Sequence, residues 1–109
     1  MELPLLVQER VIQAAAHKII YSVHAVDEMN AEDELITTQE VREVVFNGEM
    51  IEDYPEDKRG HSCLLSGMPG GRRPVHVVCS PKDDYLVIIT AYIPAAEKWE
   101  GDFKIRRKR

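Results

Sequence analysis

The chain contains no long hydrophobic run, and no apolar stretch in it approaches the ~20 residues that a membrane-spanning helix needs. Its N-terminus also lacks the cationic start and apolar core of a secretory signal. These absences predict a soluble, cytoplasmic protein with no membrane partner. The 109 residues suit a single domain, 1–109, because no internal repeat or low-complexity linker divides them.

Cysteine is scarce, and the two that are present, Cys63 and Cys79, do not form a CxxC pair. In a cytoplasmic protein we expect both to be reduced side chains in the core. The histidines and cysteines provide no tight ligand pair, so no metal is predicted. No glycine-rich loop opens a helix, because Gly70-Gly71 precedes a predicted strand, and no other cofactor is predicted.

The formal net charge of −5 is unevenly distributed along the chain. The basic C-terminal tail, residues 104–109, holds five of the fourteen Lys and Arg residues, which leaves nine against nineteen Asp and Glu. Two interpretations of this tail stay open, a solubilising terminus and a segment that attracts nucleic acid. The acidic remainder counts against tight RNA binding by itself and favours a basic protein partner.

The first half of the sequence has the periodicity of helices. From Leu5 to Ile20, apolar residues recur at intervals of three and four, with polar residues between them. The boundary signals that follow are a short extended exit at 19–21, an N-cap at Ser22 before a helix carrying His24, and a capping box of Thr37 and Glu40 before a helix that ends at Gly48.

The second half has the alternation and the turn residues of strands. Short connections join the predicted strands, so successive strands should pair antiparallel. Helices followed by such strands predict an α+β domain, with N-terminal helices packed on one face of a roughly four-stranded antiparallel sheet. The predicted strands cover residues 50–54, 61–66, 74–79 and 86–93.

Alternation in the last two strands separates an apolar side from a more polar one. The apolar sets are Val75, Val77 and Cys79 in one strand and Val87, Ile89, Ala91 and Ile93 in the next. If both sets face the helices, His76, Thr90 and Tyr92 share the open face of the sheet. An imidazole and a phenol on one open face can perform acid–base chemistry, or they can simply form a polar surface.

A series of short motifs in a fixed order extends from about Tyr21 to the end of the chain. The motifs are SxHA at 22–25, IEDYP at 51–55, SCL at 62–64, RPVHVV at 73–78, ITAYxP at 89–94 and Trp99. With this series the chain resembles the domain-of-unknown-function family 4258. That family is itself similar to the RelE-like bacterial toxins, including BrnT and MqsR relatives.

The resemblance implies a RelE-like fold and an activity similar to ribonucleases that cut RNA without a metal. It also implies a small antitoxin partner, commonly of the zinc-finger type, that is encoded nearby. The chain departs from the family in the helix after the His-Ala pair, where many relatives have arginines. Here Glu28 and Glu32 or Asp33 hold those positions, so phosphate-binding cations are missing there.

Metal-free RNA cleavage needs a base for the 2′-hydroxyl, an acid for the leaving oxygen and cations for the phosphate. We predict His24 and His76 as the acid–base pair, with Tyr92 as a third catalytic residue. The structural alternatives are that His24 fixes the entry of its helix and that His76 is one polar residue of a partly exposed sheet. The predicted substrate-binding residues are Arg72, Arg73 and Thr90.

The predicted function is therefore that of a toxin-family protein of the toxin–antitoxin type, a metal-independent endoribonuclease that uses histidine acid–base chemistry. The alternative is a catalytically silent module that binds a partner protein through the open sheet face. Because the sequence has no apolar stripe suited to a strong homodimer, we expect the isolated protein to be a monomer or a weak dimer.

Overall fold

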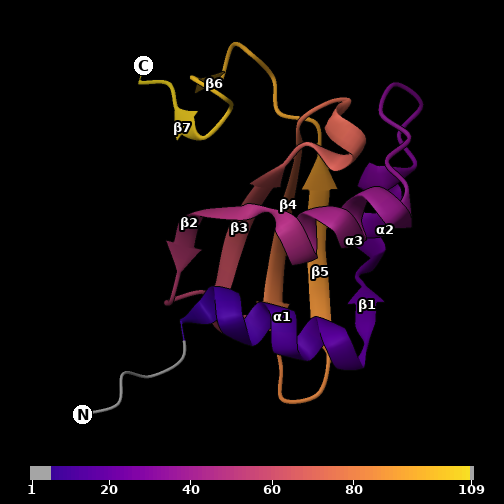
Figure 1. The fold of residues 1–109 in the computed structure, drawn as a ribbon, viewed down its shortest axis with the longest axis vertical. Helices are drawn as coiled ribbons and strands as arrows, with labels where there is room; N and C mark the ends of the chain where they lie inside the picture. Colours follow the sequence, from indigo (N-terminus) through magenta and orange to yellow (C-terminus); the bar gives the residue numbers. More distant parts are fainter. Residues whose placement is uncertain (1–5, 109) are drawn as a thin grey trace.

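Two helices lie across one face of a five-stranded sheet in the computed structural model, which describes residues 6–108 (Figure 1). Leu5, where the first helix was expected to begin, and Arg109, the last residue of the tail, lie outside the described residues. The helices are α1 (Val7–His17), α2 (Val23–Met29) and α3 (Thr38–Asn47), with a short 3-10 turn, η1 (Pro69–Gly71). The strands are β1 (Ile19–Tyr21), β2 (Glu49–Tyr54), β3 (Ser62–Gly67), β4 (Val75–Pro81), β5 (Leu86–Tyr92), β6 (Trp99–Glu100) and β7 (Ile105–Arg106).

Side chains fix the start of two helices as the sequence predicts. The Ser22 hydroxyl accepts a hydrogen bond from the backbone N–H of Ala25 and begins α2. Thr37 and Glu40 form a reciprocal capping box at the start of α3, which ends before Gly48. Both caps satisfy backbone donors that the first turn of a helix leaves without a partner.

The sheet has the strand order β1-β5-β4-β3-β2 and is larger than the four strands expected. The fifth strand is the extended exit of α1, Ile19–Tyr21, which pairs parallel to β5, whereas the other pairs are antiparallel. Backbone hydrogen bonds continue this pairing at both ends, from Leu86 to Lys18 and from Ser22 to Ile88. The mixed α+β architecture is confirmed, with one parallel edge strand added to it.

A β-bulge in β5 changes which of its side chains face the helices. Val78 pairs with Thr90 and Cys79 pairs with Ile88, so Ile89 is an extra residue opposite no partner. The alternation therefore shifts at Ile89. The residues of β4 and β5 that pack into the core under the helices are Val75, Val77, Cys79, Leu86, Ile88 and Ala91, with Ile93 partly buried against them.

The prediction that Val87 and Ile89 face the helices is consequently wrong. Both lie on the opposite face, which we call the outer face of the sheet, where they line a groove. The same bulge keeps Thr90 and Tyr92 on the outer face, because Tyr92 pairs directly with His76. A strict alternation cannot reveal such a shift, since one inserted residue reverses every side chain on one side of it.

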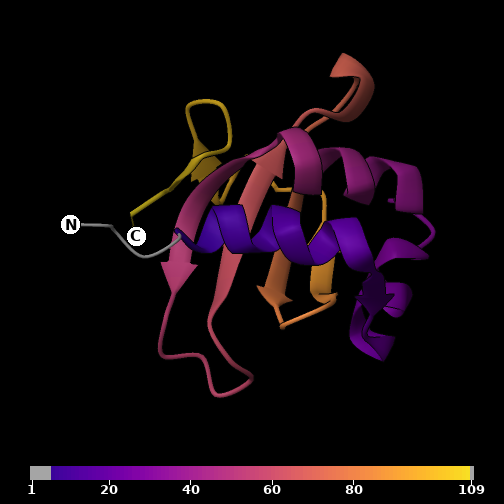
Figure 2. The same cartoon turned by 60° about the horizontal axis from the view of Figure 1, so that its bottom comes forward.

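The outer face is only partly open, whereas the sequence predicts an open face around His76, Thr90 and Tyr92. The β6–β7 hairpin lies on the side of the sheet opposite α1 (Figure 2). It covers His76, because Trp99 of β6 packs edge-on against the imidazole and the carbonyl of Phe103 bonds to it. Both Trp99 and His76 are buried. One face of the sheet is therefore covered by α1 and α3, and the other is partly covered by the hairpin.

The two cysteines lie opposite each other in β3 and β4, both free and both fully buried in the core. This agrees with the prediction of reduced core side chains. Within residues 6–108, no helix is long and apolar enough to cross a membrane.

The position of the bulge predicts which residues of β5 contribute most to the free energy of unfolding. Ile88→Ala should destabilise the protein by about 2–5 kcal/mol, because it removes a fully buried side chain from the core and leaves a cavity. Ile89→Ala should cost less, since Ile89, although only 8% exposed, lies outside the core cluster and lines an open groove. Urea denaturation of both variants measures the difference, and equal losses would contradict the register described here.

Candidate active site

The outer face of the sheet carries two groups of polar side chains that differ in access to solvent. The first surrounds His76 beneath the β6–β7 hairpin, and we call it the His76 cluster. The second lines an open hollow of about 290 Å³ beside α2, and we call it the Arg59–Lys82 groove. The groove is lined by Ser22, His24, Arg59, Ser80, Lys82, Val87 and Ile89.

Both ring nitrogens of His76 are already occupied inside the His76 cluster. Nε2 lies 2.7 Å from the carbonyl oxygen of Phe103, and Nδ1 lies 3.2 Å from the hydroxyl of Tyr92. Because a carbonyl can only accept, Nε2 carries the hydrogen, and Nδ1 of a neutral ring accepts from Tyr92. Burial lowers the pKa of His76 despite the opposing effect of the Phe103 hydrogen bond.

Arg106 fastens the hairpin over the His76 cluster. Its guanidinium stacks 4.7 Å from the centre of the Trp99 ring and donates two hydrogen bonds, 2.7 and 3.1 Å long, to the carboxylate of Glu52. Tyr54 also donates to Glu52, and burial together with that carboxylate raises the pKa of Tyr54 to about 12. The tail is thus attached to β2 through Arg106, and Lys104 adds an ion pair with Glu49.

These contacts change the roles expected for His76 and Tyr92. A fully buried imidazole with two internal partners cannot reach a substrate while the hairpin is in place. The predicted site residues His24, His76, Arg73 and Tyr92 therefore do not share one accessible cleft. A signal for the cover is present in the sequence, since Trp99-Glu100 and Ile105-Arg106 flank a turn that contains Gly101.

His24 lies in the Arg59–Lys82 groove, where α2 meets β5. The Ser22 hydroxyl caps α2 and also donates to the carbonyl of Ile89, 2.8 Å away, which attaches the first turn of the helix to the strand. His24 is the second residue of α2 and is exposed. Its position is thus fixed by the backbone, while its ring is free to meet a ligand.

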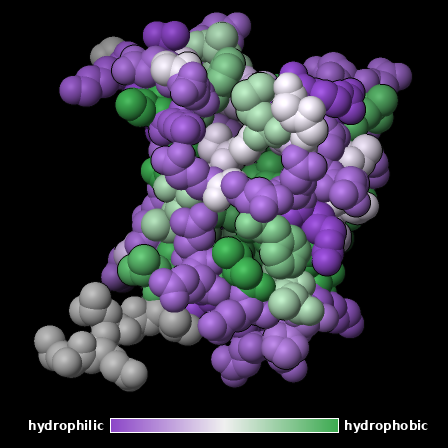
Figure 3. Space-filling model, in the orientation of Figure 1, coloured by the Kyte–Doolittle hydropathy of each residue, from purple (hydrophilic) through white to green (hydrophobic). Residues whose placement is uncertain are grey.

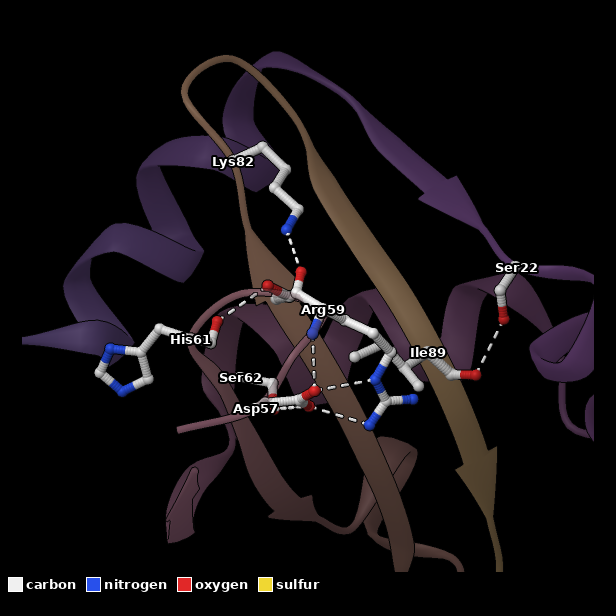
Figure 4. Close-up of polar contacts among 8 residues, drawn as sticks. Ser22, Asp57, Arg59, His61, Ser62, Lys82 and Ile89 are labelled. Carbon is white, nitrogen blue, oxygen red and sulfur yellow. Dashed lines mark hydrogen bonds and ion pairs between the residues drawn. The ribbon is translucent and has the colours of Figure 1, made fainter. Parts of the chain in front are cut away.

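The loop between β2 and β3 supplies Arg59 to the groove (Figure 4). Asp57 accepts hydrogen bonds from the backbone N–H of Arg59, from its guanidinium and from the Ser62 hydroxyl. These bonds hold the pKa of Asp57 far below its usual range, with the Arg59 side chain as the largest cause. The ion pair orients the guanidinium, which remains largely exposed.

Lys82 reaches the groove from the turn between β4 and β5. Its ammonium group donates to the carbonyl of Arg59, 2.5 Å away, and so joins the two loops. Gly60 permits this approach, because its φ of 105° suits glycine and a Cβ there would lie 2.6 Å from the Lys82 nitrogen. Two cationic side chains from separate loops therefore line the same groove.

The other predicted substrate-binding residues lie elsewhere. Arg73 donates to the Glu40 carboxylate at 3.0 and 3.1 Å and to the carbonyl of Leu35, so it supports the start of α3. Arg72 is exposed beside η1, and Thr90 is half-buried on the outer face. Neither lines the Arg59–Lys82 groove.

The groove offers one exposed imidazole, two cations and an apolar floor of Val87 and Ile89. Such a set can bind an anionic group at the cations, pack an apolar or aromatic group on the floor and exchange a proton at His24. Sequence reasoning identified His24 but missed Arg59 and Lys82. The Asp-Lys-Arg-Gly turn at 57–60 was a usable signal, because Asp and Gly are typical of a fixed loop.

The described residues were also compared with the requirements of a metal site. Among the described residues, 6–108, no three His, Cys, Asp or Glu side chains lie close enough together to hold a metal ion.

The buried His76 predicts a pH dependence of stability. Its pKa in the folded protein is below the unfolded value of 6.5, so the stabilisation is complete above that pH and declines as the pH falls. The denaturation midpoint of the wild type should therefore drop between about pH 7.5 and about pH 5, above the range in which carboxylates titrate. His76→Gln should show a smaller drop, whatever its midpoint at neutral pH. If the denaturation midpoints of the two proteins fell equally with pH, His76 would not be a buried neutral imidazole.

Comparison with known proteins identifies the family to which the chain belongs. A family model described as a domain of unknown function, DUF4258, matches residues 21–93. No curated protein and no solved structure matches the chain. The matched region includes every residue that lines the Arg59–Lys82 groove and ends before the β6–β7 hairpin. Since the match spans more than half of the chain, the protein belongs to the DUF4258 family.

Proposed function

We propose that the protein is an endoribonuclease of the bacterial toxin type, with a RelE-like fold, and that it cleaves RNA in the Arg59–Lys82 groove. The observation that carries this proposal is that an exposed imidazole, His24, lines the same groove as two cations, Arg59 and Lys82. The function agrees with the resemblance of the motif series to toxin-like domains. The proposed active site, however, does not include the His76 cluster and lies at the other end of the sheet.

The proposed reaction is an attack of the RNA on its own backbone. His24 takes the proton of a ribose 2′-hydroxyl, and the resulting oxygen bonds to the neighbouring phosphorus while the bond from phosphorus to the 5′-oxygen breaks. The Lys82 ammonium gives a proton to that leaving oxygen, so the products are a 2′,3′-cyclic phosphate and a 5′-hydroxyl. Arg59 stabilises the charge that develops on the phosphoryl oxygens. Val87 and Ile89 provide a surface for one base.

The proposal includes a cytoplasmic location and a small antitoxin, of the zinc-finger type, encoded beside the gene. An antitoxin would be required because a free ribonuclease of this kind harms the cell that makes it. The acidic balance of the chain, with a net charge of −5, favours a basic partner.

A second candidate is a catalytically silent module that binds a partner protein. It is favoured by three of the expected site residues, His76, Tyr92 and Arg73, because each of them is already bonded to another group of the protein. Under this alternative, the wild-type protein expressed alone neither slows growth nor cleaves RNA. That result would replace the first proposal with the second.

The test compares groove variants with matched controls in RNA cleavage and in growth without a partner gene. His24→Gln and Lys82→Gln should each lower the cleavage rate by about a hundredfold or more, because each removes a proton-transfer group. His17→Gln and Lys58→Gln change the same residue types at exposed positions outside the groove and should behave as wild type. EDTA should leave the rate unchanged, and thermal melts should show that all four variants fold.

Two results separate errors in the site from errors in the function. If the wild type cleaves RNA and His24→Gln cleaves it equally fast, the activity stands and the groove is not its site. If cleavage stops when EDTA is added, the metal-free mechanism is wrong.

A further inference from the structure

We propose that an apolar groove between α2 and the start of α3 binds a segment of a partner protein that presents apolar side chains flanked by Lys or Arg. We call this surface the docking groove. It shares no lining residue with the Arg59–Lys82 groove, so the proposal stands independently of RNA cleavage. The partner is defined here by its chemistry alone.

The docking groove has the size and lining of a recognition site. Its volume of about 400 Å³ lies within the ~300–1,000 Å³ range of ligand pockets. Val26 and Leu35 are 43% and 62% exposed. Binding of a partner would remove this apolar surface from water, which is favourable. The groove is lined by Tyr21, Val26, Met29, Asn30, Leu35, Ile36, Thr37 and Thr38.

Other apolar side chains are exposed on α2 and β1, the elements that contribute to the groove. Val23, at the start of α2, is 79% exposed, and Ile20, in the edge strand β1, is 38% exposed. In the space-filling view, hydrophobic side chains reach the surface in separate patches between hydrophilic ones, so apolar surface is not spread evenly (Figure 3). Exposed apolar side chains gathered near one groove are typical of a surface that another molecule covers.

Leu35 shows that this exposure is built into the backbone. Its φ of 47° lies in the left-handed region, which is uncommon for leucine. The backbone N–H of Leu35 donates to the carbonyl of Ala31, and its own carbonyl accepts from Arg73. The chain thus holds an apolar side chain in solvent at a cost in backbone strain, a combination expected where the side chain serves recognition.

Charge defines what the docking groove can bind. Asp27 follows Val26 in α2, and Glu32 and Asp33 lie in the turn just before Leu35; all three are exposed. Two cations lie near the groove. Arg73 donates to the carbonyl of Leu35 and is paired with Glu40, and Arg42 acts on Tyr21 and stacks over the Phe46 ring.

Exposed carboxylates next to the residues of an apolar groove attract cationic side chains and repel phosphate. The rim therefore disfavours RNA and anionic lipid headgroups as occupants. It matches a protein segment in which Lys or Arg flanks apolar residues.

The first experiment uses a synthetic peptide of about eighteen residues, made of Leu and Lys with the Leu residues on one helical face. Fluorescence anisotropy should show binding, and Leu35→Asn should weaken it about tenfold or more. Asparagine tolerates a positive φ, so the variant should fold at least as well as wild type. Met68→Gln removes another exposed apolar side chain, which lies outside the docking groove, and should bind as wild type.

The second experiment tests the acidic rim. Glu32→Lys combined with Asp33→Lys should weaken binding of the same peptide about tenfold at low salt, and less at high salt, where charges are screened. Glu56→Lys combined with Glu97→Lys gives the same charge change at exposed positions away from the groove and should have little effect. A peptide with Glu in place of Lys should not bind.

The proposal is overturned if Leu35→Asn binds the Leu/Lys peptide as tightly as Met68→Gln does, or if both charge pairs weaken binding equally. Either result would mean that the peptide binds a different surface or the overall charge. RNA cleavage by Leu35→Asn, measured alongside, should equal that of wild type. A loss of cleavage with normal peptide binding would instead concern the proposed ribonuclease site.

Discussion

The single extra residue in β5, Ile89, determines how both faces of the sheet are used. On one side of the bulge, Leu86 and Ile88 face the helices, and on the other side Ala91 does so. The residues left on the outer face then differ along the strand. Val87 and Ile89 form the apolar floor of a groove, whereas Tyr92 stands beside His76. Without the bulge, strict alternation would place Val87 and Ile89 under the helices together with Ala91, and Leu86 and Ile88 would lie on the outer face.

The polar end of the outer face imposes a second requirement, because a buried imidazole needs partners for both nitrogens. Tyr92 satisfies one, and the backbone of the β6–β7 hairpin satisfies the other through Phe103. The hairpin is too short to be stable alone. Its stability comes from Trp99 packing on His76 and from the Arg106 ion pair with Glu52. The basic tail therefore serves the fold, and the groove beside α2 is left as the accessible polar site on this face.

The sequence was sufficient where the signal was local. The caps at Ser22 and Thr37 and the mixed α+β architecture follow from hydrogen-bonding rules and periodicity that act within a few residues. It was insufficient where distant segments meet. The parallel pairing of β1 with β5, the cover over His76 and the approach of Lys82 to the Arg59 loop each join residues far apart in the chain. Such contacts depend on the assembled sheet, and no periodicity encodes them.

The pairing of β1 with β5 also has a consequence for the order of events in folding. Ile19 lies opposite Leu86, so the edge strand beside the N-terminus cannot join the sheet until most of the chain has been synthesised. Contacts this distant in sequence slow folding, because a long loop must close before they form. The floor of the Arg59–Lys82 groove belongs to β5 and the cover of His76 to the last strands. A nascent chain therefore lacks both, and the outer face acquires its final form only in the finished protein.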